Sequence, residues 1–262
     1  LITEYITIDQ AFATGRTDKA VVLDQIYRDF DVAIEYLPVN STGEQKATKG
    51  AAYAFKARIA IWMLDYETAK EAAGKCIDLR IYSLDPEYGL LFHSTTNVSP
   101  EFIFVIPRSE ELTGTNMGGN SFLPRFLGGT STAQPSWELF CTYTCTDGLP
   151  IDESPLFDPQ NPFKNRDPRL SELIPEFGTP FHGFIFDPGA THILNLTTNT
   201  MIVNQETQLT SQFAAYNGLI LKKGVDEAYA NKRADPNIII MRYADVLLMY
   251  AEAKIELNEI DN

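Results

Sequence analysis

Apolar residues recur at helical spacing near the start of the chain. In the segment 21–37 they follow one another at intervals of four, four, three and four residues, which places them on one face of a helix that ends before Pro38: Val22, Ile26, Phe30, Ala33 and Leu37. Residues 49–63 repeat the pattern after Thr48, the expected N-cap, with a stripe of Ala51, Phe55, Ile59 and Trp62. The stripe predicts that Trp62 belongs to the core.

A third helix is expected over residues 66–79, with Tyr66, Ala69, Ala73 and Cys76 on one side. The stretch 64–69 resembles the inter-helix turn of a tetratricopeptide unit, and Ala69 takes the small position at which two helix backbones approach closely. Asp65 stands where that motif usually has glycine. We therefore expect tetratricopeptide-like helices over residues 18–80.

The end of the chain predicts one more helix, which begins around Tyr243. Its apolar positions are Val246, Tyr250, Ala253 and Leu257. The closing residues 257–262 are typical of a turn before a partner helix, and the chain opens at Leu1 within sequence typical of a folded region. We expect the sequence to be part of a longer one.

The middle of the chain is irregular. Eleven of the fifteen prolines and eleven of the sixteen glycines fall between Pro107 and Gly224. We expect a buried strand over 101–106, a short helix over 136–143 that places Trp137 in the core, and a hairpin around 181–186. Such a long irregular region is normally functional or disordered, and its many aromatic residues favour order.

Charge excludes several classes of partner. The formal net charge is −14, with 21 Lys and Arg against 35 Asp and Glu. Nucleic acids bind through basic patches, and an anionic membrane surface would repel this chain. No apolar run reaches the roughly 18 residues that a bilayer-spanning helix needs. The composition therefore favours neutral ligands.

Few residues suggest catalysis or metal binding. The chain has no nucleophile elbow, zinc-protease motif, phosphate loop or dinucleotide fingerprint, and only three histidines. Cys141 and Cys145 lie four residues apart, a spacing that suits a pair of metal ligands or a disulfide bridge. A structural zinc site needs four ligands, and no second pair of Cys or His follows at a suitable spacing. The favoured interpretation is that both cysteines are small apolar residues that fill space. The acidic run from Asp147 to Asp167 lacks the alternation of a calcium loop, which favours solvated turns. We expect no cofactor, no metal and no enzyme activity.

Four strings, in this order, resemble the SusD/RagB family of outer-membrane nutrient-binding lipoproteins. They are ATKGAAYAFKAR at 47–58, EFIF at 101–104, NRDPRL at 165–170 after DGLPI at 147–151, and RYADVLLMYAEA at 242–253 after DPNIIIM at 235–241. The resemblance covers most of the chain but only part of a family member. The apolar residues around the helix after Arg242 and the proline-rich loop around Arg166 favour a structural role for these motifs.

The resemblance implies a mainly α fold. Residues 1–262 would form part of one SusD-like domain. In this domain, a scaffold of tetratricopeptide-like helix pairs carries a loop-rich insert with short strands over 100–235. Residues 236–262 would supply the core helix of the final pair. It also implies a non-catalytic, lipid-anchored receptor at the outer-membrane surface that binds glycans, or in some branches peptides, and delivers them to a SusC-like TonB-dependent transporter. The lipid anchor would lie outside this chain.

Sugar rings stack on aromatic side chains, and their hydroxyl groups bind Asn, Asp, Gln and Arg. Two loops combine such residues: Thr115–Gly129, with Asn116, Asn120, Phe122, Arg125 and Phe126 on backbone freed by glycines, and Asn195–Tyr216, with Gln212 and Tyr216. Burial under the loops is the alternative for each aromatic. Two other functions stay open, a tetratricopeptide-like scaffold that binds a protein or peptide and a glycoside hydrolase with a carboxylate pair.

Overall fold

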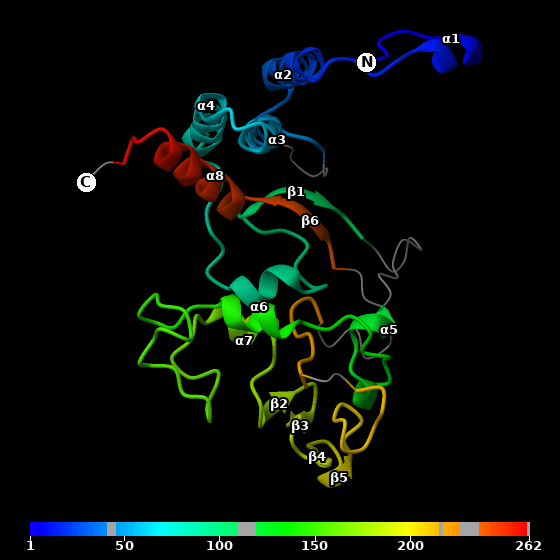
Figure 1. Cartoon of the computed structure of the whole chain (residues 1–262), viewed down its shortest axis with the longest axis vertical. Coiled ribbons are helices and arrows are strands. Elements are labelled where there is room, and N and C mark those ends of the chain that lie inside the picture. Colours follow the sequence, from blue (N-terminus) through cyan, green and yellow to red (C-terminus); the bar gives the residue numbers. More distant parts are fainter. Residues whose placement is uncertain (41–45, 109–118, 215–216, 226–235, 261–262) are drawn as a thin grey trace. The chain divides into compact units, whose positions relative to one another are not determined.

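The computed structural model describes residues 1–40, 46–108, 119–214, 217–225 and 236–260 (Figure 1). The chain divides into two compact units: unit 1 contains residues 1–84, 100–106 and 239–262, and unit 2 contains residues 85–99 and 107–238. The fold is mostly helical with small antiparallel sheets. Among the described residues, no helix combines the length and apolar character needed to cross a membrane.

Unit 1 is built from helices and one pair of strands. Its elements are α1 (Ile8–Ala13), α2 (Lys19–Tyr36), α3 (Lys49–Trp62), α4 (Tyr66–Asp78), β1 (Phe102–Ile106), β6 (Ile238–Arg242) and α8 (Tyr243–Glu256). Helix α4 packs against α3 and α8, and β6 pairs with β1 and leads directly into α8 (Figure 1). The helices expected from the apolar pattern, and the strand before Pro107, are confirmed.

Small residues form the centre of unit 1. Ala54, Ala57 and Ala60 on α3 are fully buried, as are Ala69 and Ala73 on α4. Because a methyl group occupies so little space, the helix backbones approach closely along this seam.

The prediction that Trp62 lies in the core is wrong. Its side chain is 71% exposed, at the last residue of α3. The buried face of α3 is the alanine stripe, whereas Phe55 and Ile59, on the larger-residue stripe, are only half-buried. In this helix, the close approach of the helix backbones decides which face is buried. The size of the apolar side chains therefore does not predict the buried face.

The turn between α3 and α4 has a left-handed residue. Leu64 has φ 61° and an exposed side chain. Asp65, which the motif comparison placed at the glycine position, is instead the N-cap of α4, and its carboxylate accepts a hydrogen bond from the Thr68 N–H at 3.2 Å. The residue that takes the glycine-like conformation is therefore Leu64, one position earlier.

Replacing Leu64 with glycine is expected to stabilise unit 1 by about 0.5–1 kcal/mol. The left-handed conformation costs a non-glycine residue roughly 1–2 kcal/mol, and the added freedom of glycine in the unfolded chain offsets about half of that. Urea denaturation of the two proteins measures the difference. As a control, Leu248→Gly, at an exposed position inside α8, is expected to destabilise by about 1 kcal/mol. A lower midpoint for Leu64→Gly would contradict the argument.

Polar side chains join the strands of unit 1 to its helices. Arg242 Nη1 donates to Glu101 Oε1 at 2.7 Å, and the Arg242 backbone N–H donates to Asp245 Oδ2 at 2.7 Å, which caps α8. Arg58 on α3 donates to the carbonyl of Ile240 at 2.9 Å. These residues belong to the strings ATKGAAYAFKAR, EFIF and RYADVLLMYAEA, so these strings hold the scaffold together.

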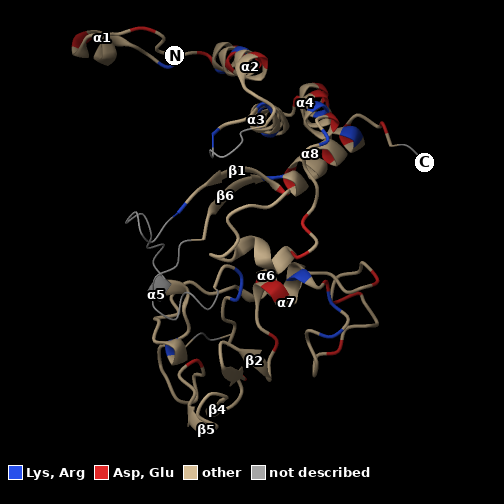
Figure 2. Cartoon of the chain, turned by 180° about the vertical axis from the view of Figure 1, so that it is seen from behind, with Lys and Arg blue, Asp and Glu red and all other residues tan. Residues whose placement is uncertain are grey.

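Unit 2 contains only short elements. They are the 3₁₀ helices η1 (Tyr88–Phe92) and η2 (Arg125–Leu127), helices α5 (Gly119–Phe122), α6 (Trp137–Thr142) and α7 (Arg169–Leu173), and strands β2 (Thr179–Phe181), β3 (Phe184–Phe186), β4 (His192–Asn195) and β5 (Thr200–Val203). The strands form one antiparallel sheet in the order β2-β3-β4-β5. Figure 2 shows that charged residues cover α2, α4 and α8, whereas the ribbon through β2, β4 and β5 carries very few.

The predicted hairpin around residues 181–186 is confirmed. Phe181 pairs with Phe184 across a two-residue turn of His182 (φ 47°) and Gly183 (φ 80°). Two successive positive φ values are those of a type I′ turn, whose twist matches that of the flanking strands.

Arg166 organises the interior beside α6 and α7. Its guanidinium donates to the carbonyls of Pro162 at 3.0 Å, Phe140 at 2.8 Å and Tyr143 at 2.8 Å, and lies over the Phe140 ring. Burial lowers the pKa of this guanidinium from its ordinary value. The loop that carries the NRDPRL string is thereby fastened to α6.

Candidate functional site

The loop before α6 packs its aromatic residues inward. Phe122 and Phe126 lie against a buried cluster that includes Leu123, Phe181 and Phe186. The Phe126 ring centroid is 5.1 Å from that of Phe184 and 5.7 Å from that of Phe186. Two of the predicted sugar-stacking residues are therefore partly buried and pack against the interior of unit 2.

Arg125 joins this loop to a second one. Its Nη1 donates to Glu206 Oε2 at 2.9 Å, and its backbone N–H donates to Glu206 Oε1. The Glu206 side chain is almost completely buried, and burial raises the pKa of its carboxyl. The Arg125–Glu206 ion pair therefore brings Arg125, a predicted sugar-binding residue, to the loop that contains Gln212.

Gly128 and Gly129 allow the first loop to fold back on itself. Gly128 has φ 81° and ends η2. A β-carbon on Gly129 would lie 2.1 Å from the Leu123 carbonyl oxygen and 2.4 Å from the Leu123 β-carbon. Only glycine fits at residue 129 without moving the backbone.

Gly129→Ala is expected to destabilise unit 2 by about 1–3 kcal/mol. The added methyl group would overlap the carbonyl group and the β-carbon of Leu123, and these atoms can move only if the backbone moves. A thermal melt compared with Gly15→Ala provides the measurement, since a β-carbon on Gly15 meets no atom within 4 Å. Equal melting temperatures for the two variants would contradict the close approach.

Hydrogen bonds from polar side chains to main-chain carbonyls fix the shape of the second loop, residues 204–214. The Asn204 amide donates to the carbonyls of Asp187 and Ala190, both at 2.8 Å, and the Thr210 hydroxyl donates to the carbonyl of Asn204. The Gln208 amide donates to the carbonyl of Ala214. Leu209, Gln212 and Phe213 take no part in these bonds and face outward with exposed side chains, and Phe213 is 72% exposed.

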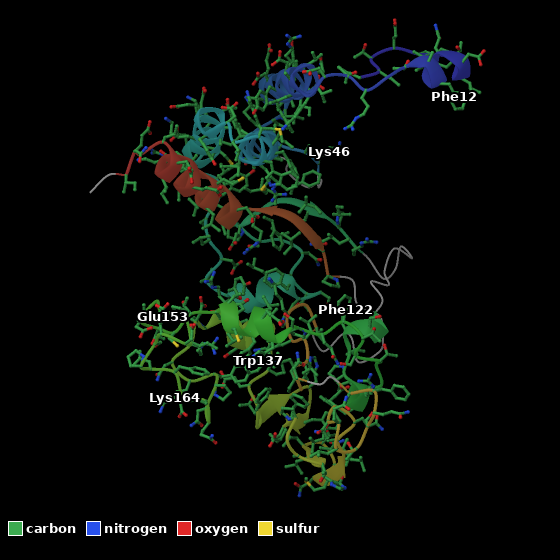
Figure 3. All side chains as sticks on the ribbon, in the orientation of Figure 1. Phe12, Lys46, Phe122, Trp137, Glu153 and Lys164 are labelled. Atoms are coloured by element: carbon green, nitrogen blue, oxygen red, sulfur yellow. The ribbon has the colours of Figure 1, made fainter. Side chains whose placement is uncertain are left out.

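Trp137 departs from its prediction as a core residue. It is 47% exposed at the first position of α6 (Figure 3). Its indole lies flat on the Phe140 ring, with centroids 4.8 Å apart and an angle of 11° between the planes. Phe140 takes the buried position of this short helix, which leaves Trp137 at the surface.

The side chains of three predicted sugar-binding residues lie outside the described part of the structure. Asn116 and Tyr216 lie outside the described residues, and Asn120 belongs to α5 without a described side chain. Of the other four, Gln212 is exposed, whereas Phe122, Arg125 and Phe126 have internal contacts. The exposed rings of Trp137 and Phe213 were not among the predicted residues. The Pro-Ser that precedes Trp137 predicted a helix start but gave no indication of which face is buried.

The acidic residues of the middle segment stabilise turns. Asp147 accepts hydrogen bonds from the Leu149 N–H and the Ser154 hydroxyl, and Asp158 accepts from the Gln160 N–H and the Asn161 amide. These bonds hold the pKa of both carboxyls below their usual range, chiefly through the Ser154 and Asn161 side chains. Within the described ranges, no group of three His, Cys, Asp or Glu residues is placed to hold a metal ion.

Comparison with known proteins identifies the family. The SusD family model matches residues 100–262, so the chain belongs to the SusD family. It is similar to a SusD-like carbohydrate-binding protein from Bacteroides fragilis, with 25% identity, a TM-score of 0.80, and 98% of this chain aligned to 50% of that one. No curated protein matches the chain.

Two further structures share the fold. A second SusD-like protein from Bacteroides fragilis is 24% identical, with a TM-score of 0.75 over 99% of this chain and 53% of its own. A laminarin-binding SusD-like protein is 16% identical, with a TM-score of 0.53 over 90% of this chain and 50% of its own. The chain therefore spans about half the length of these relatives.

Proposed function

We propose that this chain is part of a non-catalytic receptor that binds oligosaccharides at the bacterial cell surface. The observation that carries the proposal is the SusD family match over residues 100–262, which includes most of the loop-rich unit 2. The structural similarity to a SusD-like carbohydrate-binding protein and to a laminarin-binding relative supports a glycan ligand. Exposed Trp137, Gln212 and Phe213 offer the stacking and hydrogen-bonding chemistry that sugars need.

The receptor would deliver its ligand to a SusC-like TonB-dependent transporter and would be held at the outer membrane by a lipid anchor outside this chain. In unit 1, the pair α3–α4, packed along its alanine seam, would act as a tetratricopeptide-like element of the scaffold. The chain's negative charge suits neutral glycans better than acidic ones.

Isothermal titration of the full-length protein against a panel of soluble neutral and acidic glycans tests the proposal. We expect saturable binding to at least one glycan and no release of reducing ends after prolonged incubation. New reducing ends would contradict the non-catalytic assignment. Absence of binding to every glycan, together with capture of a peptide ligand, would favour the helical scaffold function instead.

A further inference from the structure

The indole of Trp137 is an exposed aromatic surface with a fixed orientation. One of its faces lies on Phe140, at 4.8 Å and 11°. Because the residue is nevertheless 47% exposed, the other face is the one open to solvent. An aromatic ring supported from behind and open in front is the geometry that stacking on a flat ligand requires.

The support behind Trp137 is rigid. Phe140 is fully buried against Leu170, Leu173 and Leu219, and the Phe163 ring meets its edge at 5.3 Å. The Arg166 guanidinium also lies over the Phe140 ring at 4.8 Å. Because the Phe140 ring is packed on its other sides, the indole that rests on it loses little conformational freedom when a ligand stacks on it.

The residue that follows Trp137 carries a carboxylate. Glu138 is exposed and follows Trp137 directly in α6. Hydrogen bonds from its own backbone N–H and from the Ser136 hydroxyl lower the pKa of this carboxyl from its ordinary value. An ionised carboxylate accepts hydrogen bonds from neighbouring sugar hydroxyls and repels a second carboxylate.

We propose that Trp137 is a stacking platform for one neutral pyranose of the ligand and that Glu138 selects against sugars with a carboxylate. This proposal rests on the glycan-binding function proposed above. It names a binding site for the glycan and the class of sugar that the site accepts. Pyranoses present a flat C–H face to the ring and hydroxyls at its rim, and a uronic acid would place its carboxylate near that of Glu138.

The test measures binding of the full-length protein and its variants to the glycan that the wild-type protein binds best. Trp137→Ala is expected to weaken binding about tenfold or more, while Trp137→Phe retains most of the affinity. The matched control is Trp62→Ala, which removes the 71% exposed indole of unit 1 and is expected to leave binding unchanged. Near-wild-type thermal melting establishes that each variant is folded.

The role of Glu138 is tested at low salt with a neutral glycan and its uronate-containing counterpart. Glu138→Gln is expected to improve binding of the uronate-containing glycan about three- to fivefold relative to the neutral one. An unchanged ratio would overturn the selectivity role.

The outcomes separate the two proposals. If the wild-type protein binds no glycan, the proposed function fails. If it binds but Trp137→Ala binds equally well, the function stands and the platform is overturned. If Trp137→Ala loses transporter capture while glycan binding persists, the exposed indole belongs to a protein interface and the platform is again overturned.

Discussion

Arg166→Ala is expected to lower the unfolding free energy of unit 2 by about 3–5 kcal/mol. Arg166 is 5% exposed, and its guanidinium donates hydrogen bonds to the carbonyls of Pro162, Phe140 and Tyr143. Its removal leaves these groups without that donor and opens a cavity between the rings of Phe140 and Phe157, over both of which it lies. Arg166→Lys is expected to recover only part of the loss, because the compact ammonium group lacks the extended planar array of donors that the guanidinium presents to these carbonyls.

The chain itself provides a reporter for this measurement. It has two tryptophans, Trp62 in unit 1 and Trp137 in unit 2. In a Trp62→Phe background, urea unfolding followed by fluorescence reports on unit 2 alone. Arg169→Ala, in the same NRDPRL string, is the control: its side chain is 62% exposed and pairs with Asp167, so a loss below about 1 kcal/mol is expected. Equal losses for the two arginines would contradict the structural role of Arg166.

The second large effect is expected at the ion pair of unit 1. Arg242→Met removes the guanidinium that donates to Glu101 at 2.7 Å, and the Glu101 carboxylate is buried. A buried carboxylate that loses its cation destabilises a protein by about 3–5 kcal/mol. Because the Arg242 side chain is 21% exposed, water reaches part of the site, and we expect about 3 kcal/mol.

Replacing both partners separates the ion pair from simple packing. The double variant Glu101→Leu, Arg242→Met is expected to recover most of the stability that Arg242→Met loses, since apolar groups can replace a buried pair at little cost. Trp62 fluorescence in a Trp137→Phe background monitors unit 1. Lys56→Met, which breaks the more exposed pair with Asp31, serves as the control, with less than about 1 kcal/mol expected. A double variant as unstable as the single one would contradict the electrostatic explanation.

The long helices could be predicted because their signals are local. The expected start at Tyr243 and the N-cap at Thr48 agree with the structure, and the buried side of α4 contains the predicted Ala69, Ala73 and Cys76. Period, cap and terminating residue all lie within a few positions of one another in these segments.

Several short elements were missed because long-range contacts define them. Strand β5 forms by pairing with β4, and β6 by pairing with β1, which lies more than a hundred residues earlier in the sequence. Helix α7 has five residues, and its N-cap Pro168 provides no side-chain cap. No local period distinguishes such segments from the surrounding turns.

The candidate site was the least predictable part. Aromatic residues on a glycine-rich loop predict stacking platforms, yet the Phe126 ring is partly buried and packs against Phe184 and Phe186. The two tryptophans were both assigned to the core, and both are exposed. The cause is the same at each site: a neighbour, the alanine seam for Trp62 and Phe140 for Trp137, takes the buried position.

The second loop of unit 2 separates the residues that determine its shape from those that meet the solvent. Buried Asn204 and Glu206, together with the hydroxyl of the exposed Thr210, hold the main chain through hydrogen bonds, whereas the exposed side chains of Leu209, Gln212 and Phe213 face outward. Substitutions at the three outward positions leave the anchoring bonds intact. The loop is therefore suited to divergence: a lineage, or a designed library, can vary these three positions while the fold keeps its stability.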